Sequence, residues 1–314
     1  MEIEGACAFC KRRNSYLPLV TLGLLMAGAS CSLRKTAVNT MADVFGEGER
    51  VYLSDEDPEL IAAALPFNMK TLETLLASNP DHRGLLLSAA ASFSLYAYGF
   101  VEPEADQIED EDFDRAEEIR RRASRLYLRG YNYGLRGLEV AHPGFRSLLP
   151  REPEQAAKEL GVDDVPLAVW TGAALGAAIS ASKDDPEATA DIAVVGALLE
   201  RALELDEDYD EGAIHGFLLS YEAGRVGGSR DKMRRHYERA IALSGGNRLS
   251  IHLSWAESVS ASDQNREEFL ELLDKVLGYD VDSHPPNRLL NILAQRRARW
   301  LQSRIDELFL GVIP

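Results

Sequence analysis

One pattern of residue types recurs in four stretches: ETLLASNP (73–80), ERALELDE (200–207), ERAIALSG (238–245) and DKVLGYDV (274–281). Each stretch begins with an acidic residue, continues with an apolar pair and ends in polar residues that stop a helix. The last three begin 38 and 36 residues apart, close to the period of about 34 residues in tetratricopeptide helix pairs. Because each such pair buries its apolar face only against its neighbours, the pattern predicts a continuous stack.

Helical spacing also recurs outside these stretches. Apolar residues fall on one face at steps of three and four in one such segment: Ile192, Val195, Leu199, Ala202 and Leu203. The segment 85–100 is apolar nearly all round, which predicts a helix covered on several sides. No sustained alternation of Val, Ile or Thr indicates strands. The sequence therefore predicts an all-α fold, a tetratricopeptide-like helical-repeat array (α-solenoid), as a single domain over 51–314.

Residues typical of helix ends punctuate this pattern. Asp57-Pro58 and Asp185-Pro186 combine a side-chain acceptor with a proline suited to the first helical turn. Asn265 with Glu268 forms a capping-box pattern. Glycines between 224 and 228, and again at 245–246, predict breaks between helices.

The first thirty residues have the features of a secretory signal. Lys11-Arg12-Arg13 is a cationic region, and 16–29 is an apolar run of the length found in signal peptides. The run is too short for a membrane-spanning helix, which needs roughly twenty apolar residues. We therefore expect a lipoprotein signal peptide over 1–30 and a tether over 31–50.

Cys31 follows this apolar run directly. The stretch GASC (28–31) resembles a bacterial lipobox, in which cleavage leaves a cysteine that carries the lipid anchor, although Gly28 replaces the usual leucine. Cleavage removes Cys7 and Cys10, so a free thiol would remain in an oxidising compartment unless Cys31 is lipidated. The alternative is simple secretion with an incidental cysteine. Ser32 favours the outer membrane over the inner membrane.

Composition excludes several classes of function. The formal net charge of -17 disfavours nucleic acid as a partner, because phosphate binding depends on clustered Lys and Arg. No two of the six histidines have the spacing of a helical metal site, so we expect no metal. Asp206–Gly212 begins like a calcium loop, but Glu211 and Phe217 occupy its decisive positions. No catalytic signature unites Ser, His and Asp, so we expect neither enzyme activity nor a cofactor.

Thirteen stretches in fixed order carry a family resemblance: DPEL (57–60), ALPFNMK (64–70), GLLL (84–87), YAYGFV (96–101), RASRLYLR (122–129), YGLRGL (133–138), HP (142–143), Trp170, KDDP (183–186), RALELD (201–206), GAIH (212–215), ERAIALSGG (238–246) and RRARW (296–300). Together they cover about residues 50 to 310. In order and spacing they resemble the T component of tripartite ATP-independent periplasmic (TRAP) transporters, called TatT.

The resemblance implies a periplasmic lipoprotein of paired tetratricopeptide-like helices that forms a homotrimer with a pore through each protomer. It also implies a TRAP-type solute-binding protein as partner and a small organic or hydrophobic ligand in the pore. A second hypothesis stays open: a tetratricopeptide lipoprotein scaffold, without a small ligand, that organises outer-membrane or secretion machinery.

Candidate ligand-binding residues are arginines and aromatics on the expected inner helices, together with one histidine. They are Tyr96, Tyr98, Tyr127, Arg129, Tyr131, Tyr133, Arg136, Trp170, His215, Tyr221 and Trp255. Arg129 or Arg136 beside the tyrosines suits an anion, because a guanidinium binds carboxylates well when partly buried. The alternatives are a solvated helix with pairs such as Glu118 and Arg122, and ordinary packing for the other aromatics.

Overall fold

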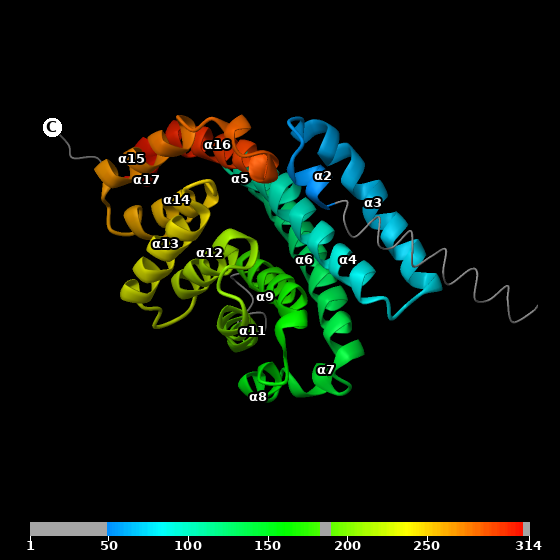
Figure 1. The fold of residues 1–314 in the computed structure, drawn as a ribbon. Helices are drawn as coiled ribbons and strands as arrows, with labels where there is room; N and C mark the ends of the chain where they lie inside the picture. The colour runs from blue at the N-terminus through cyan, green and yellow to red at the C-terminus, as the bar shows by residue number, and fades with distance from the viewer. Residues whose placement is uncertain (1–48, 183–189, 310–314) are drawn as a thin grey trace, which may run out of the picture. The chain divides into compact units, whose positions relative to one another are not determined.

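The computed structural model describes residues 49–182 and 190–309, and every regular element within these ranges is a helix (Figure 1). The all-α prediction is therefore confirmed for this part of the chain. Cys31, the expected signal peptide and the Asp185-Pro186 cap lie outside the described residues, as does most of the expected tether. These predictions stay as predictions.

The first half of the chain contains the longest helix of the described ranges. Its elements are α2 (Glu49–Leu53), α3 (Pro58–Ser78), α4 (Arg83–Tyr96), the π-helical η1 (Ala97–Val101), α5 (Glu102–Ile108), α6 (Phe113–Ala141), α7 (Phe145–Leu148), α8 (Pro153–Ala157), the 3-10 helix η2 (Val162–Asp164) and α9 (Val165–Ser180). α4 packs against α3, α6 and α9. The prediction that the apolar segment 85–100 is covered on several sides is therefore confirmed.

The second half consists of shorter helices. They are α11 (Ile192–Leu205), α12 (Tyr209–Gly224), α13 (Arg230–Ser244), α14 (Ser250–Trp255), the π-helical η3 (Ala256–Ser260), α15 (Arg266–Leu277), the 3-10 helices η4 (Val281–Ser283) and η5 (Pro285–Asn287), α16 (Arg288–Ser303) and α17 (Ile305–Leu308). The four recurring stretches coincide with the ends of α3, α11, α13 and α15. Another helix follows each of them, although a tetratricopeptide-like stacking of these pairs stays a prediction.

Helix caps explain where several of these elements begin. The Asp57 carboxylate accepts a hydrogen bond from the Leu60 N–H at 3.0 Å, and the Asn265 side chain accepts one from the Glu268 N–H at 3.2 Å. The return bond of the predicted capping box is replaced by contacts with Ser260: the Asn265 N–H donates to the Ser260 carbonyl at 2.8 Å, and the Glu268 carboxylate accepts from the Ser260 hydroxyl at 2.6 Å. Gly245, with a φ of +60°, ends α13 in the left-handed conformation that a side chain would disfavour.

α16 contacts elements from the start of the domain, in addition to its sequence neighbour α15. It packs against α2 and α3, and Figure 1 shows it beside α2. Arg297 Nη1 lies 2.5 Å from Asp106 Oδ2 on α5, and Arg296 Nη1 lies 2.7 Å from Glu59 Oε1 on α3. In an open solenoid the last helix would contact only the preceding repeat. The repeat pattern therefore did not predict these contacts.

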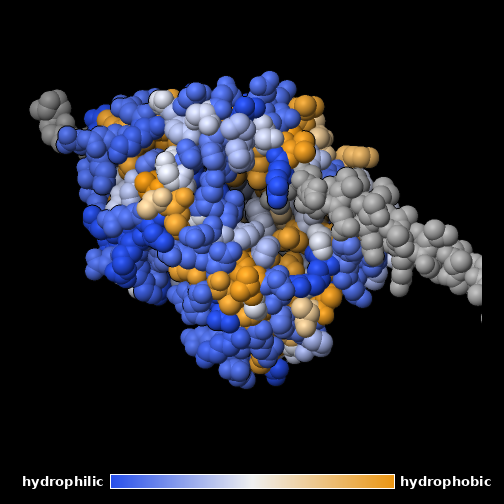
Figure 2. All heavy atoms as spheres, in the orientation of Figure 1, coloured by the Kyte–Doolittle hydropathy of each residue, from blue (hydrophilic) through white to orange (hydrophobic). Residues whose placement is uncertain are grey.

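Two helical segments are long and apolar enough to pass a test for membrane spans, namely Arg83–Ile108 and Val162–Ser180. In each, 61% of the apolar window is buried inside the protein, as in core helices. On the face drawn in Figure 2 the surface is mostly hydrophilic, with apolar residues in separate patches. One large apolar side chain that is exposed is Phe67 on α3, with an exposed fraction of 79%.

Candidate functional site

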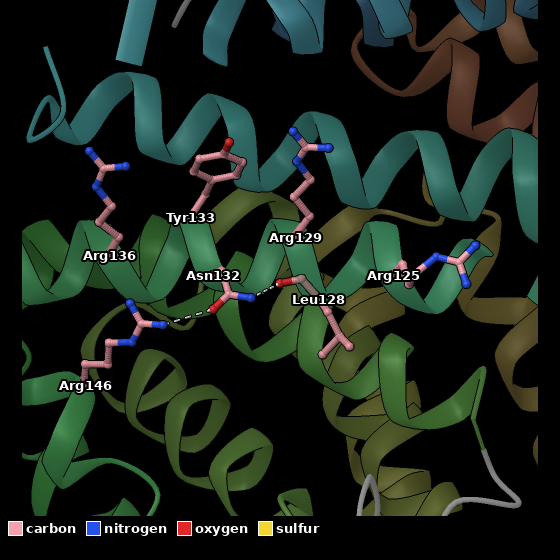
Figure 3. A pocket seen from close by; sticks show the side chains of 7 residues that line it. All are labelled: Arg125, Leu128, Arg129, Asn132, Tyr133, Arg136 and Arg146. Atoms are coloured by element: carbon pink, nitrogen blue, oxygen red, sulfur yellow. Dashed lines mark hydrogen bonds between the residues drawn. The ribbon is translucent and has the colours of Figure 1, made fainter. Parts of the chain in front are cut away.

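A surface groove runs along α6. It has a volume of about 600 Å³ and is lined by Arg125, Leu128, Arg129, Asn132, Tyr133, Arg136 and Arg146 (Figure 3). We call these seven residues the arginine groove. The first six recur at steps of three and four along α6, which places them on one face of the helix. Arg146 comes from α7, after a turn at Gly144 with a φ of +96°.

Arg129 is held in position from two sides. Its guanidinium forms an ion pair with Glu73 on α3 and lies 4.8 Å from the ring centroid of Phe93 on α4. The Tyr133 hydroxyl donates to the same Glu73 at 2.7 Å, and its ring stacks on Phe93 with centroids 5.7 Å apart. In Figure 3 Arg129, Tyr133 and Arg136 rise together from α6. An arginine fixed in this way loses little freedom when it binds an anion.

Glu73 carries its charge despite its partial burial. Burial raises the pKa of this carboxyl, but the hydrogen bonds from Lys70 and Tyr133 and the charge of Arg129 outweigh it, so the pKa is lowered. Lys70 Nζ lies 2.5 Å from Glu73 Oε2. Glu73 therefore neutralises part of the positive charge at one wall of the groove.

The other arginines of the groove have fewer partners than Arg129. Arg136 donates to the backbone carbonyl of Pro80. The Asn132 side chain donates to the Leu128 carbonyl at 2.7 Å, and its Oδ1 accepts a long hydrogen bond of 3.5 Å from Arg146. Arg125 is exposed and has no hydrogen-bond or ion-pair partner among residues 49–182 and 190–309. Four guanidinium groups thus line the groove, and the carboxylate that pairs with one of them, Glu73, lies outside the seven lining residues.

The structure brings three predicted site residues together in the groove, Arg129, Tyr133 and Arg136. The other two tyrosines of this segment point elsewhere. Tyr127 is 1% exposed, and its hydroxyl donates to Glu102 on α5 at 2.6 Å. Tyr131 packs against the core formed by α9 and α11, and this burial raises the pKa of its hydroxyl to about 12.

Tyr96 and Tyr98 lie where α4 continues into η1. Tyr96 is half-buried, and the Arg122 guanidinium lies 5.8 Å from its ring centroid. Glu118, which the sequence suggested as the partner of Arg122, instead pairs with Arg115 at 2.9 Å. Tyr98 is 49% exposed, yet burial of its hydroxyl, reinforced by the negative charge of Glu257, raises its pKa to about 12.

The remaining aromatic candidates lie on other helices and not in the groove. Trp170 is half-buried on α9. Trp255 is 4% exposed and packs against Tyr237 with ring centroids 4.9 Å apart. Tyr221 is half-buried on α12, and the Arg225 guanidinium lies 5.5 Å from its ring centroid.

His215 is buried on α12 and belongs to a cluster that spacing did not reveal. Its Nδ1 lies 2.8 Å from Nδ1 of His236 on α13, and its Nε2 lies 3.2 Å from Glu207 Oε1. Burial lowers the pKa of His215, and burial together with the charge of His215 lowers that of His236 to about 4. Among the described residues, no group of three His, Cys, Asp or Glu side chains could hold a metal ion.

Sequence reasoning missed four residues of the groove. Arg125, Leu128 and Asn132 lie at helical spacing from Arg129 and Arg136, so this spacing was a signal that could have found them. Arg146 lies beyond a turn, and no periodicity connects it with α6. Its place in the groove depends on the tertiary packing of α7.

Two comparisons with known proteins each match most of the chain. A protein of Treponema pallidum (strain Nichols), described as an uncharacterized protein, is 32% identical over 308 residues, which cover 91% of this chain and 95% of the relative. The model of the TRAP transporter T-component family matches residues 54–309. That range contains the arginine groove and nearly every described helix. The chain therefore belongs to the TRAP transporter T-component family.

Proposed function

We propose that this protein is the periplasmic T component of a TRAP transport system, lipid-anchored through Cys31, and that it binds a TRAP-type solute-binding protein. The family match over residues 54–309 carries the proposal, because it extends across nearly the whole described domain. Family membership itself associates the chain with TRAP transport. The identity of the partner, the anchor and the periplasmic side of the membrane are the parts that we add.

Two further features belong to the same proposal. A homotrimer with a pore through each protomer would let a small organic or hydrophobic ligand pass between the partner and the T component. The contacts of α16 with α2, α3 and α5 support this part of the proposal, because they join the last helices of the described chain to the first ones. Native mass spectrometry of the purified protein tests both features, because it reports the number of chains and any co-purified small molecule.

Affinity purification tests the partner. Tagged protein is solubilised from the membranes of its own organism, and the co-purified proteins are identified by mass spectrometry. We expect a TRAP-type solute-binding protein. Recovery of outer-membrane assembly or secretion machinery alone would instead support the scaffold hypothesis.

The lipid anchor is tested by Cys31→Ser. Without the thiol no acyl chain can be attached, and the expected signal peptide does not supply a stable anchor after cleavage. We expect the variant to move from the membrane fraction to the soluble periplasmic fraction. Retention in the membrane after intact export would contradict the anchor.

A further inference from the structure

We propose that the arginine groove is the surface that docks an acidic, extended segment of the protein partner. This docking role rests on the proposed function, because the proposed function supplies the partner. It adds the location of the contact and its chemistry. The groove is defined by its seven lining residues, six of them on α6.

The dimensions of the groove favour a segment of polypeptide. Residues 125 to 136 of α6 span about 16 Å at the rise of an α-helix, which matches about five residues of an extended chain. Small-molecule sites bury most of the surface of their ligand. Here Arg125, Leu128, Arg129 and Asn132 are exposed, so an occupant of the groove would stay open to solvent along one side, as a docked peptide does.

The charge of the groove specifies an acidic occupant. The chain as a whole has a net charge of -17 and repels acidic proteins. Against this background four arginines line one stretch of surface, and the only carboxylate paired with any of them among the described residues is Glu73, the partner of Arg129. A guanidinium presents a planar fork that matches the two oxygens of a carboxylate. A local positive stripe on an acidic protein therefore selects acidic segments and directs them to one place.

The four arginines divide into two pairs by their support. Arg129 is held by Glu73 and Phe93, and Arg136 is held by the Pro80 carbonyl. Arg125 lacks a partner in the described part of the chain, and Arg146 has one long side-chain hydrogen bond to Asn132. Arg129 and Arg136 set the register of the acidic segment, while the less constrained Arg125 and Arg146 adapt to it.

The test uses Arg125 and Arg146, because replacing them leaves the contacts of Arg129 and Arg136 with α3 and α4 and with the Pro80 carbonyl intact. The groove variant is Arg125→Gln/Arg146→Gln. The matched control is Arg235→Gln/Arg299→Gln, which changes the net charge equally at two exposed residues of α13 and α16 outside the groove. Circular dichroism and thermal unfolding check that both variants fold like the parent protein.

Two probes are measured with the parent protein and both variants. Fluorescence anisotropy reports binding of a labelled decaglutamate peptide, and calorimetry reports binding of the solute-binding protein recovered by affinity purification. We expect the groove variant to bind each probe at least about fivefold more weakly than the control, as the loss of two charged contacts implies. Raising the salt from about 50 mM to about 300 mM should weaken the parent more than the groove variant.

The outcomes separate this inference from the proposed function. If the solute-binding protein binds and the groove variant binds it as tightly as the control does, the docking role is wrong and the proposed function stands. If no solute-binding protein is recovered but decaglutamate binding depends on the groove, the acidic-segment site stands and the proposed function fails. Groove-independent binding of decaglutamate overturns the docking role.

Two further measurements on the same proteins test other occupants of the groove. If succinate displaces the peptide at concentrations near those of the peptide itself, the groove is a small-anion site and the docking role is wrong. If sedimentation shows that the groove variant loses self-association that the control keeps, the occupant is a second copy of this chain. Either result overturns the docking of a partner segment.

Discussion

Three half-buried or buried histidines lie on the C-terminal helices, and each has a lowered pKa. Burial lowers the pKa of His236 to about 4, with a contribution from the charge of His215. Burial and the charge of Lys275 lower the pKa of His252 to about 4. In the unfolded chain these side chains titrate near their ordinary pKa of about 6.5. Between pH 6.5 and 4 the unfolded state therefore binds more protons than the folded state.

This difference predicts acid destabilisation. Because the unfolded state takes up the protons first, the free energy of unfolding should fall as the pH drops from about 6.5 to about 4, with a slope of up to about 1.4 kcal/mol per pH unit for each such histidine. Urea denaturation across this range measures the slope. The variant His236→Gln/His252→Gln should show a shallower slope than the parent protein. An unchanged slope would mean that other groups cause the acid effect.

At the scale of single residues, local signals were predictable and distant contacts were not. Asp57 and Asn265 cap helices because a side-chain acceptor at the N-cap lies within reach of the N–H three residues later. The contact of His215 with His236 joins residues 21 positions apart and requires α12 to pack against α13. Arg146 enters the arginine groove for a similar reason, through the placement of α7.

At the scale of elements, α6 approaches α9 closely at a glycine. A Cβ at Gly134 would lie 2.2 Å from Thr171 Oγ1 and 3.3 Å from Thr171 Cα. Thr171 is fully buried, and its hydroxyl donates to the Leu167 carbonyl. Neither helix can shift without disturbing the core between them. The absence of a side chain at Gly134 therefore sets the distance between the two helices.

Gly134→Ala should consequently destabilise the protein. The gain in helix propensity is about 1 kcal/mol, and overpacking costs about 1 to 3 kcal/mol. A Cβ only 2.2 Å from an oxygen places the cost in the upper part of that range, so we expect a net loss of up to about 2 kcal/mol in urea denaturation. Gly224→Ala is the control, because a Cβ at Gly224 would meet no heavy atom of the described residues within 4 Å. The control should be neutral or stabilising.

A second substitution identifies the cause. Thr171→Ala removes the oxygen that the new methyl group would meet, so the double variant should lose less than the sum of the two single variants. Strict additivity would indicate that the destabilisation of Gly134→Ala does not arise from this contact.

The positions of helices were predictable to a greater degree than their internal irregularities. The recurring stretches at 200–207, 238–245 and 274–281 mark the ends of α11, α13 and α15, because each apolar stretch is followed there by Asp or Gly residues that favour a helix end. The π-helical segments η1 and η3 continue α4 and α14 without a break in the apolar pattern. A π-helix shifts the hydrogen-bond register within a helix, and the spacing of apolar residues does not reveal that shift.

At the scale of the domain, α16 connects regions that are far apart in the sequence. Arg297 contacts Asp106 on α5 at 2.5 Å, across 191 positions, and Glu257 on η3 at 2.7 Å. Its guanidinium lies 4.2 Å from the ring centroid of Trp300. The repeat pattern predicted contacts between neighbouring helix pairs, and nothing in it identified a partner for α16 at the start of the domain. A contact between residues so far apart in the sequence depends on the direction of every helix and turn between them.

The role of α16 predicts a long-range effect of Arg297→Met. The substitution leaves Glu257 and Asp106 without this cation, so we expect a loss of about 2 kcal/mol, less than for a fully buried pair because Arg297 is 30% exposed. Amide hydrogen exchange should become faster in α5 and η3 as well as in α16. Arg296→Met is the matched control and should change stability little, since its partner Glu59 is exposed and such a pair adds little to stability. Faster exchange that reaches α5 would mean that α16 and the first helices unfold as one cooperative unit. Faster exchange confined to α16 would contradict this prediction and indicate an open array, in which the terminal helix stabilises only itself.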